Sequence, residues 1–151
     1  MGRMPSRMNV ARRGINIQCN LCLLCMKEEE TIQHLFTYCE VSQRVWDKCD
    51  RWVKLTTVRN NDIINHFRKF YAIGLSKKAN IVWKGMSLAI VWEIWKHRNK
   101  IVFRNGIVDD VEIFAMAQVS TLQWTKTGRQ KVHYSFSDWC LNPRECLVQL
   151  R

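Results

Sequence analysis

The chain has 151 residues, of which 47% are hydrophobic and 25% charged, and its formal net charge is +11 at pH 7. This composition excludes an intrinsically disordered chain, because it supplies enough apolar surface for the core of one domain or two small ones. The positive surplus favours polyanionic partners, with nucleic acid ahead of an acidic membrane surface.

The first 18 residues contain four arginines, no acidic residue and no apolar core of a secretory signal. A short helix is expected over residues 8–13, ending at Gly14. Without a signal, the seven cysteines indicate a reducing intracellular compartment, cytoplasmic or nuclear. Clustered cysteines in such a compartment are more often metal ligands or free thiols than disulfides.

A segment rich in cysteine and histidine follows at residues 19–39. Its first part, CNLCLLC, contains two overlapping C-x2-C pairs, Cys19/Cys22 and Cys22/Cys25, and spacing alone prefers neither strongly. Its last part, HLFTYC, supplies His34 and Cys39. Zinc takes four tetrahedral nitrogen and sulfur ligands, so these residues predict one zinc site, whereas the alternative is a set of free buried thiols.

His34 and Cys39 cannot share one face of a straight α-helix, because positions five apart diverge by about 140°. We therefore expect a short helix capped by Thr31 to end between them, and a second helix to begin with Ser42 as its cap. Four apolar residues of this second helix share one face and are expected in the core: Val45, Trp46, Cys49 and Val53.

Three further helices are predicted downstream from caps and helix breakers. They cover residues 62–70, 76–103 and 109–128, counting the caps Asp62, Ser76 and Asp109 or Asp110. The most apolar stretch lies in the second of these helices. Its longest uncharged run, from Gly85 to Trp92, has eight residues, too few for a membrane span, and a buried helix is expected.

Apolar residues at helical spacing predict the core faces of the last two helices. The expected stripe of the longer helix is Leu88, Trp92 (or Val91), Trp95 and Val102, and that of the last helix is Val111, Phe114, Ala115 and Leu122. KHRNK, residues 96–100, is expected to be a solvated helix end that could also contact phosphate. Residues 129–151 are expected to be irregular, with at most a short strand over VHYSF.

The remaining residues indicate neither a second metal site nor an enzyme. His66, His97 and His133 have no ligand-spaced partners, and Cys140 and Cys146 are expected to be free thiols. The tryptophans at helical spacing (Trp83, Trp92 and Trp95) are expected in the core, although exposed ones could stack on bases. No phosphate loop, Ser/His/Asp order or H-E-x-x-H motif occurs in the sequence, so no catalytic residue is predicted.

Four stretches carry a resemblance to a known family: MPSRMNVARRGI, CLLC, KEEETIQHLFTYC and RVW. Together they resemble the zinc-binding domain that follows the reverse transcriptase in plant LINE-type (non-LTR) retrotransposons. The later stretches IVWEIWKHRNKIVF and SFSDWCLNP resemble the region after that domain. The resemblance implies that Cys22, Cys25, His34 and Cys39 bind one structural Zn²⁺, with Cys19 as an extra cysteine.

This chain departs from the family at Met26, where glycine is usual. Glycine eases the tight turn that directs backbone amides at thiolates, so Met26 is expected to strain the knuckle without removing a ligand. Three thiolates and one Zn²⁺ leave about one negative charge at the site, and the chain stays strongly basic.

The sequence therefore predicts a mostly α-helical chain, with a small zinc knuckle followed by a helical bundle. Residues 1–55 are expected to form the reverse-transcriptase-type zinc-binding domain and residues 56–151 a helical C-terminal region. The expected function is non-catalytic: a structural zinc module that binds RNA or DNA with little sequence choice. Phosphate contacts are assigned to an arginine lead, consisting of Arg3, Arg7, Arg12 and Arg13.

The upstream reverse transcriptase domain is a further expected partner, whereas no membrane and no small-molecule substrate are expected. A protein-interaction or scaffolding module, or an inactive retrotransposon remnant, is the alternative.

Overall fold

The computed structural model describes residues 4–16, 18–54, 62–69, 75–128 and 132–150. Helices make up its regular structure, and within these ranges there is no strand, only an isolated bridge between Leu21 and Glu29. The elements are α1 (Arg7–Arg12), the π-helical turn η1 (His34–Tyr38), α2 (Glu40–Val53), α3 (Ile63–Lys69), α4 (Lys77–Arg104), α5 (Asp110–Thr127), α6 (Phe136–Leu141) and α7 (Pro143–Val148). The predicted fold class, mostly α with a Cys/His cluster ahead of the helices, is confirmed.

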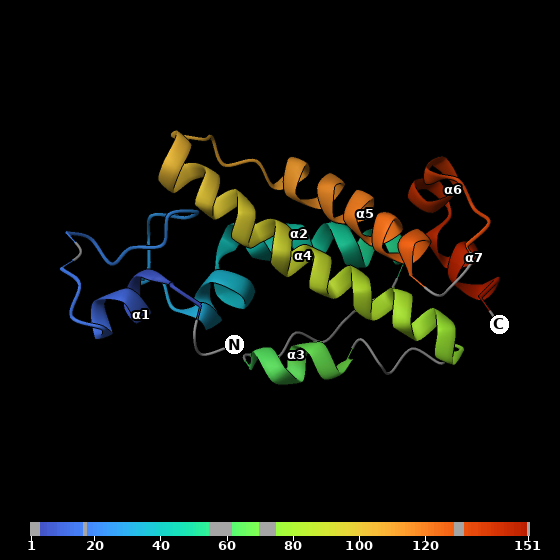
Figure 1. The fold of residues 1–151 in the computed structure, drawn as a ribbon, viewed down its shortest axis with the longest axis horizontal. Coiled ribbons are helices and arrows are strands. Elements are labelled where there is room, and N and C mark those ends of the chain that lie inside the picture. Colours follow the sequence, from blue (N-terminus) through green and yellow to red (C-terminus); the bar gives the residue numbers. More distant parts are fainter. Residues whose placement is uncertain (1–3, 17, 55–61, 70–74, 129–131, 151) are drawn as a thin grey trace.

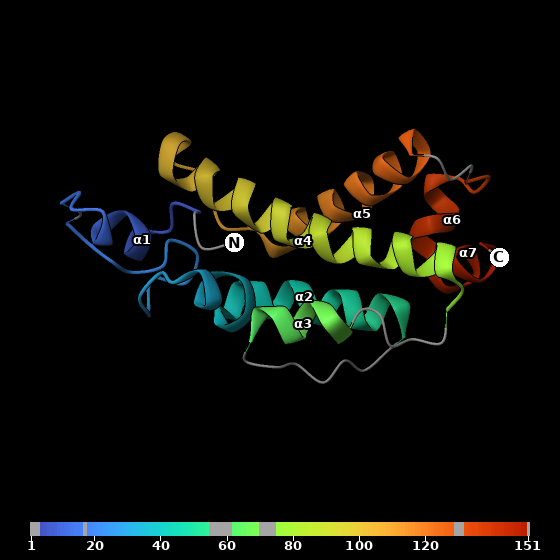
Figure 2. The same ribbon diagram turned by 60° about the horizontal axis from the view of Figure 1, so that its bottom comes forward.

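The long helix α4 organises the molecule. It packs most extensively on α5, and α2 contacts both of them (Figure 1). The turned view shows α4 above α2 and α3, with α1 and the Cys/His segment at one end and the short helices α6 and α7 at the other (Figure 2). The site is therefore built at one end of an elongated helical bundle. No helix in the described ranges combines the length and apolarity needed to cross a membrane.

Helix starts follow the predicted caps at three positions. The side chains of Asp62, Ser76 and Asp109 each accept a hydrogen bond from a backbone amide in the first turn of the helix that follows. At the other ends, Gly14 adopts a φ of +79° just after α1, and Gly128 follows α5. Residues 55–61 of the expected loop and Phe70, the expected helix end, lie outside the described residues.

Helix α2 shows the predicted core face, since Val45, Trp46, Cys49 and Val53 are all buried. The predicted cap Ser42 is wrong, because α2 begins at Glu40. The Ser42 hydroxyl is buried and donates to the backbone oxygen of Leu35, 2.5 Å away, which ties α2 to the preceding turn.

The expected core stripe of α4 is wrong except for Val91, the alternative to Trp92, which is buried. Leu88, Trp92 and Val102 are exposed and Trp95 is partly buried, whereas the buried face runs along the opposite side of the helix. Its members are Ala79, Val82, Trp83, Met86, Ala89, Ile90, Val91 and Ile94. Apolar residues lie on both sides of α4, so helical spacing alone could not identify which side packs on the bundle.

The expected solvated end of α4 is also partly wrong. Lys96 and Lys100 are exposed, but His97 and Arg98 are 5% and 6% exposed. The His97 Nε2 atom lies 3.0 Å from the backbone nitrogen of Asp109, from which it accepts a hydrogen bond, and so holds the start of α5. His97 is therefore a core histidine.

Helix α5 and the C-terminal segment differ from the prediction as well. Of the expected stripe of α5, Leu122 is buried and Phe114 partly buried, whereas Val111 and Ala115 are exposed. The segment expected to be irregular contains α6 and α7, and VHYSF includes no strand residue among the described ones. Two signals were missed: the Ser135–Asp138 capping box that starts α6, and Pro143 at the first position of α7.

Candidate metal centre

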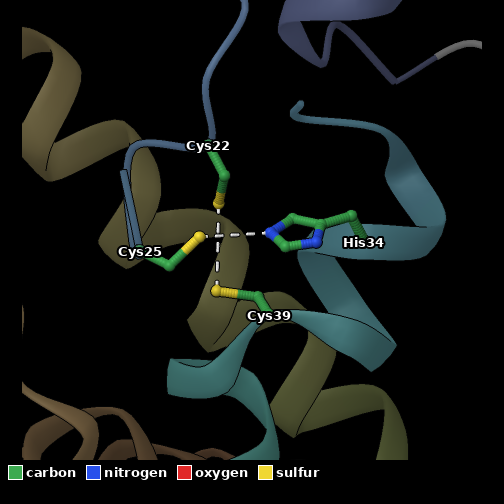
Figure 3. A group of neighbouring side chains, drawn as sticks. All are labelled: Cys22, Cys25, His34 and Cys39. Carbon is green, nitrogen blue, oxygen red and sulfur yellow. Dashed lines mark hydrogen bonds between the residues drawn. The ribbon is translucent and has the colours of Figure 1, made fainter. Parts of the chain in front are cut away.

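Four side chains converge at the end of the bundle (Figure 3). They are Cys22, Cys25, His34 and Cys39, whose ligand atoms all lie within 4.8 Å of one another. The Cys22 and Cys39 sulfurs are 3.8 Å apart, and the Cys25 sulfur is 3.3 Å from Nε2 of His34. Among the described residues, these four side chains form a group that could hold a metal ion.

The donor set fits a zinc ion. Zinc–sulfur bonds of about 2.3 Å at tetrahedral angles place two sulfurs about 3.8 Å apart, and a sulfur and a nitrogen slightly closer. The separations across the cluster match this geometry, and the sulfur pair is far beyond the length of a disulfide bond. Three sulfurs and one imidazole nitrogen therefore supply all four positions of a tetrahedral site.

A tight turn presents the first two ligands. The backbone amide of Met26 donates to the oxygen of Cys22, 2.8 Å away, which closes the turn over Cys22–Cys25. Amides of Cys22 and Glu30 bond across the loop to oxygens of Glu28 and Asn20, at 2.7 Å and 2.8 Å. Met26 has a φ of +54°, in the left-handed region that favours glycine, and its side chain is exposed.

The π-helical turn η1 presents the other two ligands. As predicted, Thr31 caps the short helical segment that leads into η1, because its hydroxyl accepts from the amide of His34 at 2.9 Å. The amide of Cys39 then donates to the oxygen of His34 at 2.7 Å, a bond that spans five residues. A π-turn holds one more residue per turn than an α-helix, so residues five apart come to the same side. The expected helix end between His34 and Cys39 is replaced by this wider turn.

Hydrogen bonds and burial shift the pKa values of the two buried thiols in opposite directions. The hydrogen bond from Cys22 to Cys39, together with burial, raises the pKa of the Cys22 thiol above its usual range. The same bond lowers the pKa of Cys39, and the backbone amides of Val41 and Ser42, at the start of α2, lower it further. Those amides belong to a helix N-terminus, which stabilises a thiolate at this position.

The far nitrogen of His34 faces a carboxylate. Its Nδ1 atom is buried, makes no hydrogen bond among the described residues, and lies 3.3 Å from a carboxylate oxygen of Glu28. Histidines that bind a metal through one nitrogen commonly direct the other toward a carboxylate, which fixes the tautomer. Glu28 is thus placed to orient His34 when a metal is bound at Nε2.

A buried carboxylate joins this centre to the bundle. Glu30 is fully buried, and its carboxylate oxygens accept from Arg98 of α4 at 2.6 Å and 3.2 Å. The same carboxylate accepts from the backbone amides of Arg7 and Leu23 at 2.9 Å and 3.4 Å. The sequence does not predict this pair, because 68 positions separate Glu30 from Arg98 and no spacing rule links the two stretches that contain them.

The other predicted site residues do not belong to the cluster. Cys19 is partly buried and outside the four-residue group, and its backbone oxygen accepts from the Arg7 guanidinium at 2.7 Å. Arg12 and Arg13 are exposed at the end of α1. Arg3 lies outside the described residues.

The remaining cysteines and histidines behave as predicted. Cys140 and Cys146 are free thiols, and burial, followed by the nearby carboxylates of Asp138 and Glu145, raises the pKa of Cys146 to about 11. His66 is buried edge-on against the Trp46 ring, and His133 is exposed.

Comparison with known families addresses the identity of this segment. Residues 1–46 match a family model described as zinc-binding in reverse transcriptase. These residues are a reverse-transcriptase zinc-binding domain. The match includes all four members of the Cys/His cluster and ends at Trp46, within α2. The family and the cluster together assign one zinc ion to this domain. No curated protein and no solved structure is significantly similar to the chain.

Proposed function

We propose that the zinc-binding domain is structural and non-catalytic, and that the chain binds RNA or DNA through phosphate contacts. The observation that carries this proposal is the positive charge of the chain, +11, together with the exposed arginines at the end of α1, the helix that is bound to the zinc loop. We further propose that the chain comes from the C-terminal part of a plant LINE-type reverse transcriptase and acts inside the cell. The resemblance of the cysteine-rich segment and of the later stretches to such proteins supports this origin.

The docking of α1 supports a nucleic-acid role for the arginine lead. Backbone amides of Arg7 and Met8 donate to the side chain and the backbone oxygen of Glu30, at 2.9 Å and 3.3 Å. These bonds fasten α1 to the loop that carries the first zinc ligands. Arg12 and Arg13 at its exposed end are then held in place relative to that loop, and they can contact successive phosphates with little sequence choice.

The donor set supports a structural role for the metal. A catalytic zinc site keeps one position open for water or substrate, whereas four protein ligands fill every position. Zinc would then stabilise residues 22–39 and, through them, the orientation of α1.

A protein-interaction or scaffolding module is the second candidate, with the upstream reverse transcriptase as an expected partner. It is supported by an apolar groove of about 790 Å³ between the N-terminal half of α4 and the end of α5. Ile81, Leu88 and Trp124 are exposed in its lining.

Fluorescence anisotropy with labelled single strands of about 15 nucleotides, RNA and DNA, tests the first proposal. Replacing Arg12 and Arg13 by alanine should weaken binding and reduce the slope of log K against log salt by about 1.4, or 0.7 for each lost phosphate contact. The matched control is the double variant Arg51→Ala/Arg144→Ala, which removes two exposed arginines away from α1 and should keep the slope. Absence of binding by the wild-type chain at low salt would exclude nucleic-acid binding and leave the second candidate.

A further inference from the structure

The C-terminal half of α4 carries aromatic side chains that the described residues leave largely exposed. Trp92 is 48% exposed and Phe103 78% exposed, although both are large apolar residues. They are eleven residues apart, which places them within about 20° of each other on the helix and about 16 Å apart along it. Trp95, which is partly buried, lies between them in the sequence and about 60° from Trp92 around the helix. These residues form an aromatic row along α4.

A second row, of basic residues, runs beside the aromatic row. This row consists of Lys96, Lys100 and Arg104, which are four residues apart in the sequence. Each is about 6 Å further along the helix axis than the one before and is rotated by about 40°, so the three side chains lie on neighbouring positions of successive turns. Lys96 lies 3.0 Å from a carboxylate oxygen of Glu93, and Lys100 lies 2.9 Å from one of Glu112. Both rows line one groove of about 490 Å³ between this half of α4 and the start of α5. We call it the α4 groove.

The charges of the α4 groove restrict what can occupy it. Three basic side chains face two carboxylates in the lining, so the groove keeps a net positive charge with His97 counted as neutral. A second copy of the chain is disfavoured, because each copy carries a net charge of +11. A purely apolar partner would leave the lysine and arginine heads desolvated. The occupant should therefore combine flat apolar groups with a regular line of negative charge.

Single-stranded nucleic acid has this combination. Unpaired bases stack on aromatic side chains while the phosphates follow a basic groove, and every base has a face that can stack. A duplex keeps its bases stacked on one another and so cannot use the aromatic row.

We propose that the α4 groove is a binding surface for single-stranded nucleic acid. Bases stack on Trp92 and Phe103, and phosphates follow Lys96, Lys100 and Arg104. This inference rests on the proposed nucleic-acid function but assigns it a second surface, separate from the arginine lead.

The test uses the full zinc-loaded chain and labelled single strands and duplexes of about 15 nucleotides. Trp92→Ala and Phe103→Ala should each weaken single-strand binding roughly 5- to 150-fold, the loss expected for one stacked base, and leave duplex binding unchanged. Both side chains are exposed, so thermal unfolding should stay close to that of the wild type. Trp124→Ala is the matched control, because Trp124 is 44% exposed but lies in the other groove, and it should bind single strands like the wild type.

The results distinguish this inference from the proposed function. If Trp92→Ala and Phe103→Ala bind single strands as well as Trp124→Ala does, the α4 groove is not a nucleic-acid surface. Binding that then depends on Arg12 and Arg13 alone would retain the proposed function without this surface. Equal weakening of single-strand and duplex binding would also overturn the inference, because stacking acts only on unpaired bases. A wild-type chain that binds neither strand form would overturn both.

Discussion

At the scale of single residues, Met26 determines how easily the first zinc turn closes. Its φ of +54° places a non-glycine residue in the left-handed region, at a cost of roughly 1–2 kcal/mol. The turn tolerates this cost because the side chain points to solvent and the Met26 amide still bonds to the Cys22 oxygen. Sequence comparison with the family identified the position, and the structure supplies the conformational reason.

Replacing Met26 by glycine should stabilise the zinc-bound chain, because glycine adopts positive φ without steric cost. The expected gain is up to about 1 kcal/mol, part of the strain being offset by the greater freedom of glycine in the unfolded chain. Competition with a chromogenic chelator should show tighter zinc binding, and urea unfolding should show higher stability.

Lys54→Gly is the control for this prediction. Lys54 ends α2 with a φ of +56°, away from the ligands, so glycine there should raise stability and leave zinc affinity unchanged. Equal zinc affinities for Met26→Gly and the wild type would show that the turn carries no strain relevant to the metal.

At the scale of elements, one ion pair connects the zinc segment to α4. Arg98 forms a bidentate pair with Glu30, and its guanidinium carbon also lies 5.2 Å from the centre of the Trp95 ring. Since both charged groups are buried, each depends on the other for compensation. The pair therefore fixes where α4 meets the zinc loop.

Glu30→Gln should destabilise the chain strongly, because it leaves the Arg98 guanidinium buried without a negative partner. Breaking a buried pair in this way costs about 3–5 kcal/mol, a large part of the stability of a typical domain. Urea unfolding followed by circular dichroism measures the loss.

Two further variants show whether that loss of stability comes from the broken ion pair. Glu29→Gln removes an exposed carboxylate from the neighbouring position and should have little effect. The double variant Glu30→Gln/Arg98→Met removes both charges and should recover much of the stability. If Glu30→Gln unfolds like Glu29→Gln, the ion pair does not hold the zinc loop on α4.

Caps could be predicted from the sequence, because each depends on residues a few positions apart, whereas the choice of Cys22 and Cys25 over Cys19 as ligands came from the family resemblance. Thr31, Ser76 and Asp109 cap the turns that follow them, and the four predicted ligands meet in space. The sequence could not show which side of α4 is exposed, because apolar residues recur at helical spacing on both sides of the helix. The Glu30–Arg98 pair could not be predicted either, because it depends on how distant segments pack.

At the scale of the whole molecule, the zinc centre and the bundle share one core. Buried Cys22, Leu35 and Phe36 of the zinc segment belong to the same apolar cluster as residues of α2, α4 and α5. Trp46 of α2 also donates to the backbone oxygen of Phe36 at 2.8 Å. Loss of the metal should therefore weaken the packing of the helices as well as the loop.

Removing zinc with a chelator should lower the melting temperature of the helical signal on the order of 10 °C, if the ion is held about a thousandfold above its dissociation constant. Thermal unfolding followed by far-ultraviolet circular dichroism, with metal content measured in parallel, checks this. Cys39→Ser should reproduce the loss of metal and stability, whereas Cys19→Ser should keep one zinc per chain. A helical melting curve unchanged by chelation would show that the bundle folds independently of the metal.

The apolar residues on the exposed side of α4 should affect the solubility of the protein. Ile81, Leu88, Trp92 and Phe103 lie within about 60° of one another on the helix and leave an apolar strip in water. At low ionic strength the positive charge of each molecule keeps such strips apart, and added salt screens that repulsion at distances beyond about 10 Å. The protein should therefore be most soluble in dilute buffer and become less soluble as salt rises, unless a ligand covers the strip.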